Sequence, residues 1–308
     1  MTRLSDAFER AHRLPAEVTP LHQPVERSHD EVLRLWHFDT DAQRTGASLG
    51  RRPSGKTDAP AATTARFPDE VQDKIILGEH VEPGLVEQYR RVGAALHHAQ
   101  TQRGVRSVMI ASAVAAEGKT LTTTNLALTL SHSFDRRVLL IDADLRRPSV
   151  HKMFGLPNDE GLLDCLKVQG GGRLLVHPVS RNLWVLTAGR PTSDPMGDLV
   201  SDLMKQLLVD AMEQFDWVII DTPPVALMPD ANLLAGMIDA ALLVVSAGTT
   251  PYPLVQRATA AIGSERILGV VLNRADRAGL AHEYGYYYGY ADRSHAAPKK
   301  RFGRRSSR

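Results

Sequence analysis

Short apolar runs alternate with helical segments between residues 105 and 272, and this alternation constrains the fold more than any other feature. Near-continuous runs of Val, Ile and Leu are typical of strands buried on both faces, and helices between such strands indicate a parallel sheet. The expected strands are Val105–Ala111, Arg137–Asp142, Leu183–Thr187, Trp217–Ile220, Ala240–Val245 and Ile267–Leu272. The expected helices are 84–100, Lys119–Ser133, Leu199–Phe215 and Leu254–Ile262. The sequence therefore predicts an α/β fold, with a central, mostly parallel sheet flanked by helices on both faces.

Composition limits the classes of protein that fit this pattern. The chain has 308 residues with 43% apolar content, which is enough for one large α/β domain with additional segments. Its single cysteine, Cys165, excludes a disulfide framework. No apolar run approaches the roughly 20 residues that a membrane-spanning helix needs. We therefore expect a protein of the cytoplasm, which reaches a membrane only through a partner.

A phosphate-binding loop is predicted directly after the first expected strand. Residues 112–120 read SAVAAEGKT, and their Gly-Lys-Thr end and strand–loop–helix context match such a loop. Backbone N–H groups at a helix start carry partial positive charge, and Lys119 adds a full charge for the β and γ phosphates. The Thr120 hydroxyl suits Mg²⁺. Ala115 and Ala116 stand where glycine is common, so this loop has less freedom to adopt positive φ.

Carboxylates follow two of the other expected strands. Asp142 and Asp144 end the second run, and Asp221 ends the fourth. Asp142 and Asp144 are either helix-capping aspartates in a loop, or groups that reach Mg²⁺ and polarise an incoming hydroxyl. Because ligands of parallel sheets bind at the carboxyl ends of the strands, these groups and the loop should meet at one edge. We expect Thr120, Asp142 and Asp221 to hold Mg²⁺, directly or through water.

The sixth run ends in a polar pair, Asn273-Arg274. Such a pair is either a simple strand cap or, at a nucleotide site, a source of a hydrogen bond from Asn273 to the adenine edge. Together with the loop it completes the expected ATP site. The residues expected to contact ATP are Ala115, Ala116, Glu117, Gly118, Lys119, Thr120, Leu121 and Asn273.

With these motifs in place, the chain resembles the bacterial tyrosine kinases (BY-kinases) of capsule and exopolysaccharide biosynthesis. That family belongs to the deviant P-loop ATPases, together with MinD and ParA. The resemblance is carried by residues 117–120, by 138–148 followed by His151, and by 216–224. It covers about residues 80–290, and the amphipathic start is similar to that of the exosortase-associated members. The resemblance implies a P-loop NTPase fold and an ATP- and Mg²⁺-dependent protein-tyrosine autokinase with the catalytic residues Lys119, Asp142, Asp144 and Asp221.

A tyrosine cluster distinguishes a kinase from a plain ATPase. Residues 282–290 read HEYGYYYGY and hold five of the chain's seven tyrosines. A last strand or a low-complexity tail is the plainer interpretation, but a Gly-spaced segment buries five rings poorly. The resemblance implies that these hydroxyls accept phosphate in a neighbouring subunit's site, and each phosphate adds about two negative charges. The implied acceptors are Tyr284, Tyr286, Tyr287, Tyr288 and Tyr290.

The resemblance also implies partners. Family members form a homo-oligomeric ring when unphosphorylated, through a Glu-x-x-Arg-x-x-Arg helix. Glu87 and Arg90 keep the first two positions here, and Gly93 takes the third. Arg91 is the candidate substitute for the missing arginine. A separate transmembrane activator, of the chain-length-determinant type, would hold the chain at the inner face of the cell membrane. No specific nucleic-acid partner is expected.

The chain divides into four expected segments. Residues 1–15 have the spacing of an amphipathic helix, which either docks on its own domain or binds a partner. Residues 16–66 are expected to be a mostly disordered linker with a weak helical patch at Glu31–Trp36. A kinase domain over 67–276 and a flexible tyrosine-rich, basic tail over 277–308 complete the chain. The basic charge of the tail suits anionic lipid or phosphotyrosines, or is simply solvated.

Two other functions fit parts of the pattern. A MinD- or ParA-like switch ATPase would use the same loop without phosphorylating tyrosine, but this loop lacks the extra lysine that those proteins carry near its start. A non-catalytic scaffold of the polysaccharide machinery would use nucleotide only for shape, and the altered loop (Ala115-Ala116) and Gly93 favour it slightly.

Overall fold

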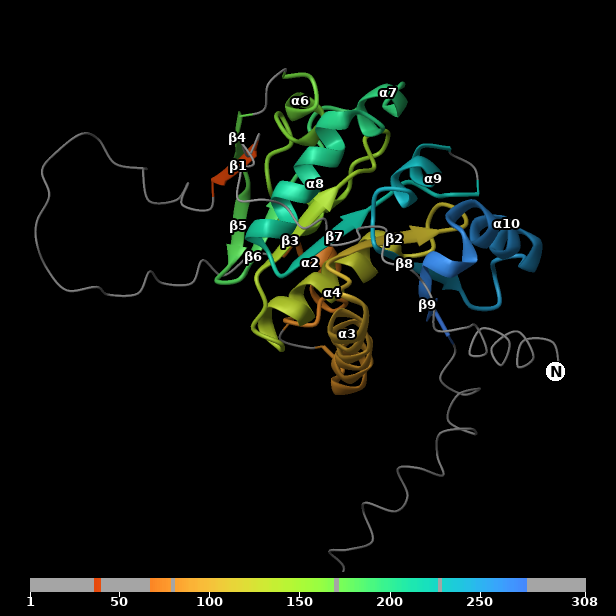
Figure 1. The fold of residues 1–308 in the computed structure, drawn as a ribbon. Coiled ribbons are helices and arrows are strands. Elements are labelled where there is room, and N and C mark those ends of the chain that lie inside the picture. The colour runs from red at the N-terminus through yellow and green to blue at the C-terminus, as the bar shows by residue number, and fades with distance from the viewer. Residues whose placement is uncertain (1–35, 40–66, 79–80, 169–171, 227–228, 276–308) are drawn as a thin grey trace, which may run out of the picture.

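The computed structural model describes residues 36–39, 67–78, 81–168, 172–226 and 229–275, and a seven-stranded sheet forms its centre (Figure 1). The strands of this sheet are β2 (Ser107–Ser112), β3 (Val138–Asp142), β5 (His177–Ser180), β6 (Leu183–Leu186), β7 (Trp217–Asp221), β8 (Ala240–Ser246) and β9 (Ile267–Asn273). Their order is β5-β6-β3-β7-β2-β8-β9, and each neighbouring pair is parallel except the antiparallel β5–β6 pair. The predicted mostly parallel α/β fold is confirmed.

Helices cover both faces of this sheet (Figure 1). The described helices are α2 (Asp69–Gln72), α3 (Pro83–Arg103), α4 (Lys119–His132), α5 (Val150–Phe154), α6 (Leu162–Cys165), α7 (Met196–Leu199), α8 (Asp202–Gln214), α9 (Pro229–Ala235), α10 (Tyr252–Ile262) and the 3₁₀ helix η2 (Ser264–Arg266). Successive β2 residues enter different cores, because side chains alternate along a strand. Met109 packs in the core under α8, α9 and α10, and Ile110 packs in the core under α3 and α4.

The burial of the strands explains why their sequences are so apolar. Every residue of β2, β3, β7 and β8 is buried. Strand β9 lies at the edge of the sheet, and its Val270 and Leu272 are 45% and 55% exposed. Within the described part of the chain, no helix has the length and apolar character needed to cross a membrane.

The expected single helix over Leu199–Phe215 is wrong at its start. Two helices occupy this stretch, α7 and α8, and the break lies at Val200 and Ser201. The Ser201 hydroxyl accepts a hydrogen bond from the Met204 amide at 3.2 Å, so it caps the start of α8. Serine competes with helical hydrogen bonding in this way, and an apolar period that continues across it hides the break.

One part of the expected, mostly disordered linker over 16–66 is ordered, because Trp36–Asp39 forms strand β1. Strand β1 pairs in parallel with β4 (Gly172–Leu175) as a separate two-stranded sheet. Trp36 is 2% exposed, and its amide donates to the buried Asp210 carboxylate at 2.9 Å. The Phe38 and Phe215 rings meet edge to face, with centroids 5.5 Å apart. The linker sequence thus contains a short segment that the domain buries.

The remaining terminal predictions lie outside the described residues. These are the amphipathic helix over 1–15, the rest of the linker including most of the helical patch at Glu31–Trp36, and the tail over 277–308. Trp36, the last residue of that patch, is part of a strand rather than a helix.

Candidate active site

The phosphate-binding loop connects β2 to α4 at the carboxyl edge of the sheet, where the sequence predicts it. Helix α4 begins at Lys119, and Gly118 precedes it with a left-handed φ of 86°. Ala116 also has a left-handed φ, of 64°. This conformation costs an L-residue about 1–2 kcal/mol, so Ala116 adopts at an energetic cost a φ that glycine reaches freely.

Asp221 is the centre of a buried polar cluster at the end of β7. Its carboxylate accepts from the Lys119 ammonium at 2.7 Å, and the two side chains are 0% and 7% exposed. The hydroxyls of Thr120 and Thr123 donate to the same carboxylate at 2.7 and 3.0 Å. Lys119 is therefore held at the loop by a carboxylate, which an incoming phosphate can replace as its partner.

Asp142 lies beside Asp221, because β3 and β7 pair in parallel with these residues in register. Burial and then the neighbouring Asp221 charge raise the pKa of Asp142 to about 7. The Asp142 carboxylate accepts from the amides of Ser149 and Val150 at 3.0 and 2.9 Å. These amides open α5, so Asp142 also performs the capping role that its sequence context allows.

Asp144 completes the acidic group and shares the same loop. Its carboxylate accepts from the Arg147 amide at 3.0 Å, and its own amide donates to Asp142 at 3.2 Å. Burial raises the pKa of Asp144 above its ordinary value, and the Lys119 charge opposes that shift. The functional and the capping interpretations of these two aspartates are thus compatible. A carboxylate has about four lone pairs, so it can accept from loop amides and still have lone pairs left for a ligand.

The donors at this edge suit Mg²⁺. They are the Thr120 hydroxyl and the carboxylates of Asp142 and Asp221, all oxygen atoms, and Mg²⁺ prefers oxygen ligands with several sites left for water and phosphate. Among the described residues, no group of three or more His, Cys, Asp or Glu side chains has the arrangement to hold a metal ion alone. These oxygen ligands therefore suit a Mg²⁺ ion that is bound together with nucleotide phosphates, rather than one bound by protein ligands alone.

Two polar residues at this site were missed by the sequence reasoning. The Ser149 hydroxyl lies 2.8 Å from the Thr120 hydroxyl, and Thr123 donates to Asp221 as described. Thr123 could have been found, because it follows Lys119 by four residues and so shares its helix face. Ser149 could not, because a loop of irregular backbone brings it to α4.

Glu117 and Asn273, two of the residues expected to contact ATP, bond to each other. The Asn273 amide nitrogen donates to the Glu117 carbonyl at 2.8 Å. The Glu117 carboxylate is buried and accepts from the amides of Val114 and Ser246 at 2.8 and 3.1 Å. The expected bond from Asn273 to the adenine edge would have to share an amide group that already holds the loop.

Comparison with known proteins identifies the family. The ParA family model, described as NUBPL iron-transfer P-loop NTPase, matches residues 105–276. Tyrosine-protein kinase YwqD of Bacillus subtilis is 37% identical over 204 residues, which cover 65% of this chain and 85% of YwqD. The kinase domain of the Escherichia coli tyrosine kinase ETK superposes with a TM-score of 0.58 at 28% identity, covering 72% of this chain and 97% of that domain. The chain belongs to the bacterial tyrosine-kinase family, within the ParA-type P-loop NTPases.

The length of the relatives differs around this shared kinase domain. The putative tyrosine-protein kinase CapB of Staphylococcus aureus is 28% identical, and the match covers 90% of CapB. The match to tyrosine-protein kinase etk of E. coli, at 34% identity, covers only 28% of that longer protein.

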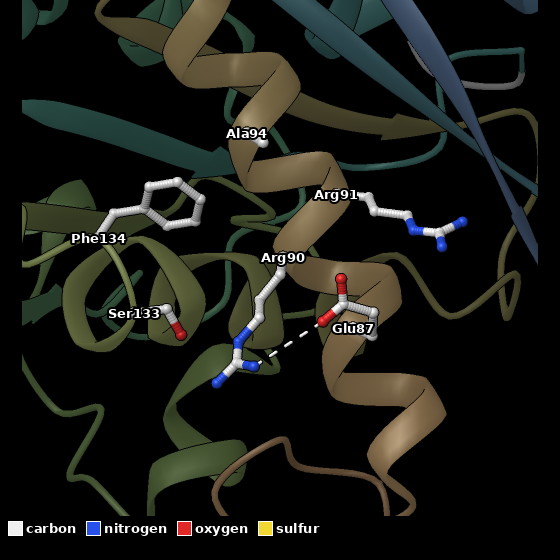
Figure 2. A pocket seen from close by; sticks show the side chains of 6 residues that line it. All are labelled: Glu87, Arg90, Arg91, Ala94, Ser133 and Phe134. Carbon is white, nitrogen blue, oxygen red and sulfur yellow. Dashed lines mark ion pairs between the residues drawn. The ribbon is translucent and has the colours of Figure 1, made fainter. Parts of the chain in front are cut away.

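The helix α3 carries the residues that the family resemblance assigns to subunit contact. Arg90 and Glu87 form an exposed ion pair at 3.8 Å, and they line a surface pocket of about 390 Å³ with Arg91, Ala94, Ser133 and Phe134 (Figure 2). Figure 2 shows Arg90 pointing toward the side of Ser133, whereas Arg91 points to the other side of α3.

Gly93, which replaces the second arginine of the family motif, lies against the Phe134 ring. A Cβ atom at residue 93 would come within 2.7 Å of a Phe134 ring carbon. Gly93 is buried, so an arginine there would displace the ring. The departure from the motif is thus linked to the aromatic side chain that packs on α3 from the end of α4.

Proposed function

We propose that this chain is an ATP- and Mg²⁺-dependent protein-tyrosine autokinase that phosphorylates the C-terminal tyrosine cluster of a second copy. The observation that carries this proposal is the meeting of Lys119, Asp142 and Asp221 beside a phosphate loop. That meeting occurs in a chain 37% identical to a tyrosine-protein kinase. We propose Lys119, Asp142, Asp144 and Asp221 as its catalytic residues.

The reaction is an in-line phosphoryl transfer. The tyrosine oxygen of the acceptor bonds to the γ-phosphorus of ATP while the bond from that phosphorus to the β–γ bridging oxygen breaks, and ADP leaves. Lys119 exchanges its Asp221 partner for phosphate oxygens and neutralises the charge that develops on them. The backbone amides at the start of α4 hold the β-phosphate. Positioning and electrostatics supply most of the rate enhancement.

Asp142 is the residue that takes the phenolic proton. A free tyrosine has a pKa near about 10, so its hydroxyl needs a base near neutral pH. A base works best when its own pKa lies near the working pH, and burial beside Asp221 raises the pKa of Asp142 to about 7. Asp144 is the supporting group, since its backbone amide donates to the Asp142 carboxylate.

Thr120, Asp142 and Asp221 are the residues that would hold Mg²⁺ with the nucleotide phosphates. When bound, Mg²⁺ supplies positive charge to the β- and γ-phosphate oxygens. The Thr120 hydroxyl lies 2.7 Å from an Asp221 oxygen, so the two oxygens are close enough to share one cation.

The tyrosine cluster is the best candidate acceptor on chemical grounds. Five tyrosines lie within residues 284–290, and the two others in the chain are Tyr89 and Tyr252. Tyr89 is partly buried in α3, and burial raises its pKa. A phosphate acceptor must enter a site at the sheet edge, which Tyr89 cannot do from within a packed helix. Tyr252 is exposed on α10 and serves as an internal comparison for acceptor mapping.

The cellular role that we infer is regulation of exopolysaccharide or capsule polymerisation and export. Putative tyrosine-protein kinase CapB and tyrosine-protein kinases etk and wzc are the relatives that support this role. We further propose a ring of copies through Glu87, Arg90 and Arg91, with a separate transmembrane activator that holds the chain at the inner membrane face. The kinase domain would span 67–276, with the strand at 36–39 docked onto it and the acceptor tail over 277–308.

Transfer between copies can be tested with two complementary variants. One chain has all five cluster tyrosines replaced by phenylalanine, and the other has an intact cluster and the substitution Asp142→Asn. Each alone should acquire little phosphate on residues 284–290 when incubated with ATP and Mg²⁺. Their mixture should acquire phosphate on the Asp142→Asn chain, located by mass spectrometry. ATP turnover without phosphotyrosine in the mixture or the wild type would favour a switch ATPase, and nucleotide binding without turnover a scaffold.

A further inference from the structure

Glu117 is a buried carboxylate next to the loop that receives phosphate, and this placement needs an explanation. The residue is 2% exposed, and its carboxylate accepts from two backbone amides and from the Thr250 hydroxyl. All three donors are neutral groups. A negative charge close to bound phosphates weakens their binding by repulsion, so the side chain must serve a purpose other than contact with ATP.

The three donors come from two separate parts of the molecule. The Val114 amide belongs to the phosphate loop itself and lies 2.8 Å from one Glu117 oxygen. Ser246 is the last residue of β8, and its amide lies 3.1 Å from the other Glu117 oxygen. The same oxygen also accepts from the hydroxyl of Thr250, just before α10. The carboxylate therefore ties the loop to the β8–α10 connection.

Asn273 holds the same loop from the end of β9. Its side-chain amide donates to the Glu117 carbonyl at 2.8 Å. It also lies so close to the loop that a Cβ atom on Gly118 would come within 2.1 Å of the Asn273 nitrogen. The backbone of Asn273 is fixed in turn, because its carbonyl accepts from the Ala247 amide at 2.8 Å. Glu117 is thus held through both its side chain and its main chain.

Ala116 lies between the two ends that these bonds fix. It has a φ of 64°, which an L-residue adopts at an energetic cost. Such a conformation persists where surrounding contacts determine it. The Glu117 side chain bonds back to Val114, three residues earlier, so the short segment that contains Ala116 is closed on itself. In a glycine-rich loop, no such restraint would be needed, because glycine reaches positive φ without strain.

We propose that Glu117, assisted by Asn273, is a positioning residue that holds Ala116 in its left-handed conformation and thereby preorganises the phosphate loop for nucleotide. The proposal rests on the proposed function only in requiring that this loop binds MgATP or MgADP. We call this set of hydrogen bonds around Glu117 the clamp. It holds a backbone conformation that alanine, unlike glycine, does not adopt freely. It also connects Ser246, Thr250 and Asn273 to the phosphate loop through hydrogen bonds.

A binding assay with loop variants tests this proposal. The probe is a fluorescent N-methylanthraniloyl ADP with Mg²⁺, titrated into the full chain. Glu117→Ala should raise its Kd by at least about tenfold, because the left-handed conformation is no longer held. Glu117→Gln keeps some acceptors and should raise the Kd less. Thr250→Val, which removes one donor, should raise it about threefold, whereas Thr259→Val, within α10, should leave it unchanged.

Rescue by glycine separates positioning from general stability. Adding Ala116→Gly to Glu117→Ala should bring the Kd back to within about threefold of wild type, because glycine adopts positive φ without the clamp. A lower melting temperature with no recovery of the Kd by Ala116→Gly would overturn the proposal, as would a Kd for Glu117→Ala equal to that of wild type. If Glu117→Ala does not fold, the Thr250→Val and Glu117→Gln measurements decide in the same way.

The outcome is independent of tyrosine chemistry. A wild-type chain that binds the ADP probe but never phosphorylates tyrosine would contradict the proposed kinase function. The Kd values of the loop variants would still decide whether Glu117 positions the loop. A phosphorylating wild type whose Kd is insensitive to Glu117→Ala would reject the clamp alone.

Discussion

Two ion pairs of similar chemistry lie in opposite surroundings in this molecule. Lys119 and Asp221 are 2.7 Å apart with side chains 7% and 0% exposed. Arg90 and Glu87 are 3.8 Å apart with side chains 55% and 52% exposed. The first pair sits beside the phosphate loop, and the second lies on the surface of α3 (Figure 2).

The difference in burial separates their energetic roles. A buried pair has lost the hydration of both charges, so removing one partner leaves the other uncompensated. An exposed pair is hydrated and screened, so it contributes little to folding and is available to a partner surface. The contrast teaches that the buried pair matters for the stability of the nucleotide-free chain, whereas the exposed pair matters only if the proposed subunit contact forms on α3.

The largest expected effect comes from breaking the buried pair. Lys119→Met should lower the free energy of unfolding of the nucleotide-free chain by about 3–5 kcal/mol, since Asp221 would be a buried charge without its cation. Urea unfolding followed by circular dichroism measures this. A loss below about 1 kcal/mol, which is typical of exposed pairs, would remove the distinction between the two pairs.

The neighbouring carboxylate should matter for rate more than for fold. Asp142→Asn should lower kcat for tyrosine phosphorylation about 100-fold or more if Asp142 takes the phenolic proton. Steady-state kinetics at saturating ATP measure it, with Asp159→Asn, in an exposed loop, as the matched control. A kcat within about threefold of wild type would mean that Asp142 is only the cap of α5.

Gly93, on the same helix as the exposed pair, is expected to be required by the Phe134 ring that packs against it. Gly93→Arg restores the family motif but should destabilise the chain by about 1–3 kcal/mol, because the Phe134 ring must move. Combining it with Phe134→Ala should recover part of the loss, measured by urea unfolding. If the single variant were as stable as wild type, the glycine would not be explained by its contact with the ring.

The acidity of the buried cluster gives a pH prediction for the nucleotide- and metal-free chain. The folded pKa of Asp142, about 7, lies above its ordinary value of 3.8, so between these pH values the folded state binds more protons than the unfolded state. The contribution of this group to stability therefore falls as pH rises toward and through 7. Asp142→Asn has no charge to bury, so its melting temperature relative to wild type should increase from pH 6 to pH 8.

Two histidines also contribute to the pH dependence of stability. Burial lowers the pKa of His151 and His177, so these groups favour the folded state as pH rises. They are present in both chains and cancel in the comparison of wild type with Asp142→Asn. A constant gap in melting temperature across this pH range would mean that Asp142 does not titrate there.

The smallest expected effect is on the exposed pair. Arg90→Ala should change the free energy of unfolding by only about 0–1 kcal/mol, while a ring built on this face should dissociate. Analytical ultracentrifugation of the unphosphorylated chain measures the second part. Unchanged oligomers after Arg90→Ala, or a monomeric wild type, would remove α3 from the proposed subunit contact.

The sequence predicted the parts of the molecule that depend on local pattern. Continuous apolar runs predicted the central strands, because strands buried on both faces need apolar side chains at every position. The parallel arrangement then predicted that Asp142 and Asp221 would meet at one edge with Lys119, and the structure brings them together. The roles of these residues remain predictions.

The parts that could not be predicted depend on contacts between distant residues. Strand β1 is four residues long, and its burial comes from α8, far along the chain. Gly93 and Phe134 meet only because α3 packs on α4. The Glu117 carboxylate bonds to the amide of Ser246, 129 positions away. Sequence spacing carries no information on such pairings.

Mapping of phosphotyrosine on the chain isolated from cells that naturally make it tests the central claim most directly. The account predicts phosphate on tyrosines within residues 284–290, and none there when the chromosomal copy carries Lys119→Met or Asp142→Asn. Circular dichroism of each purified variant must show a folded chain. A wild-type chain that turns over ATP yet carries no phosphate on these tyrosines, or variants labelled as fully as wild type, would contradict the assignment of this site as a tyrosine kinase.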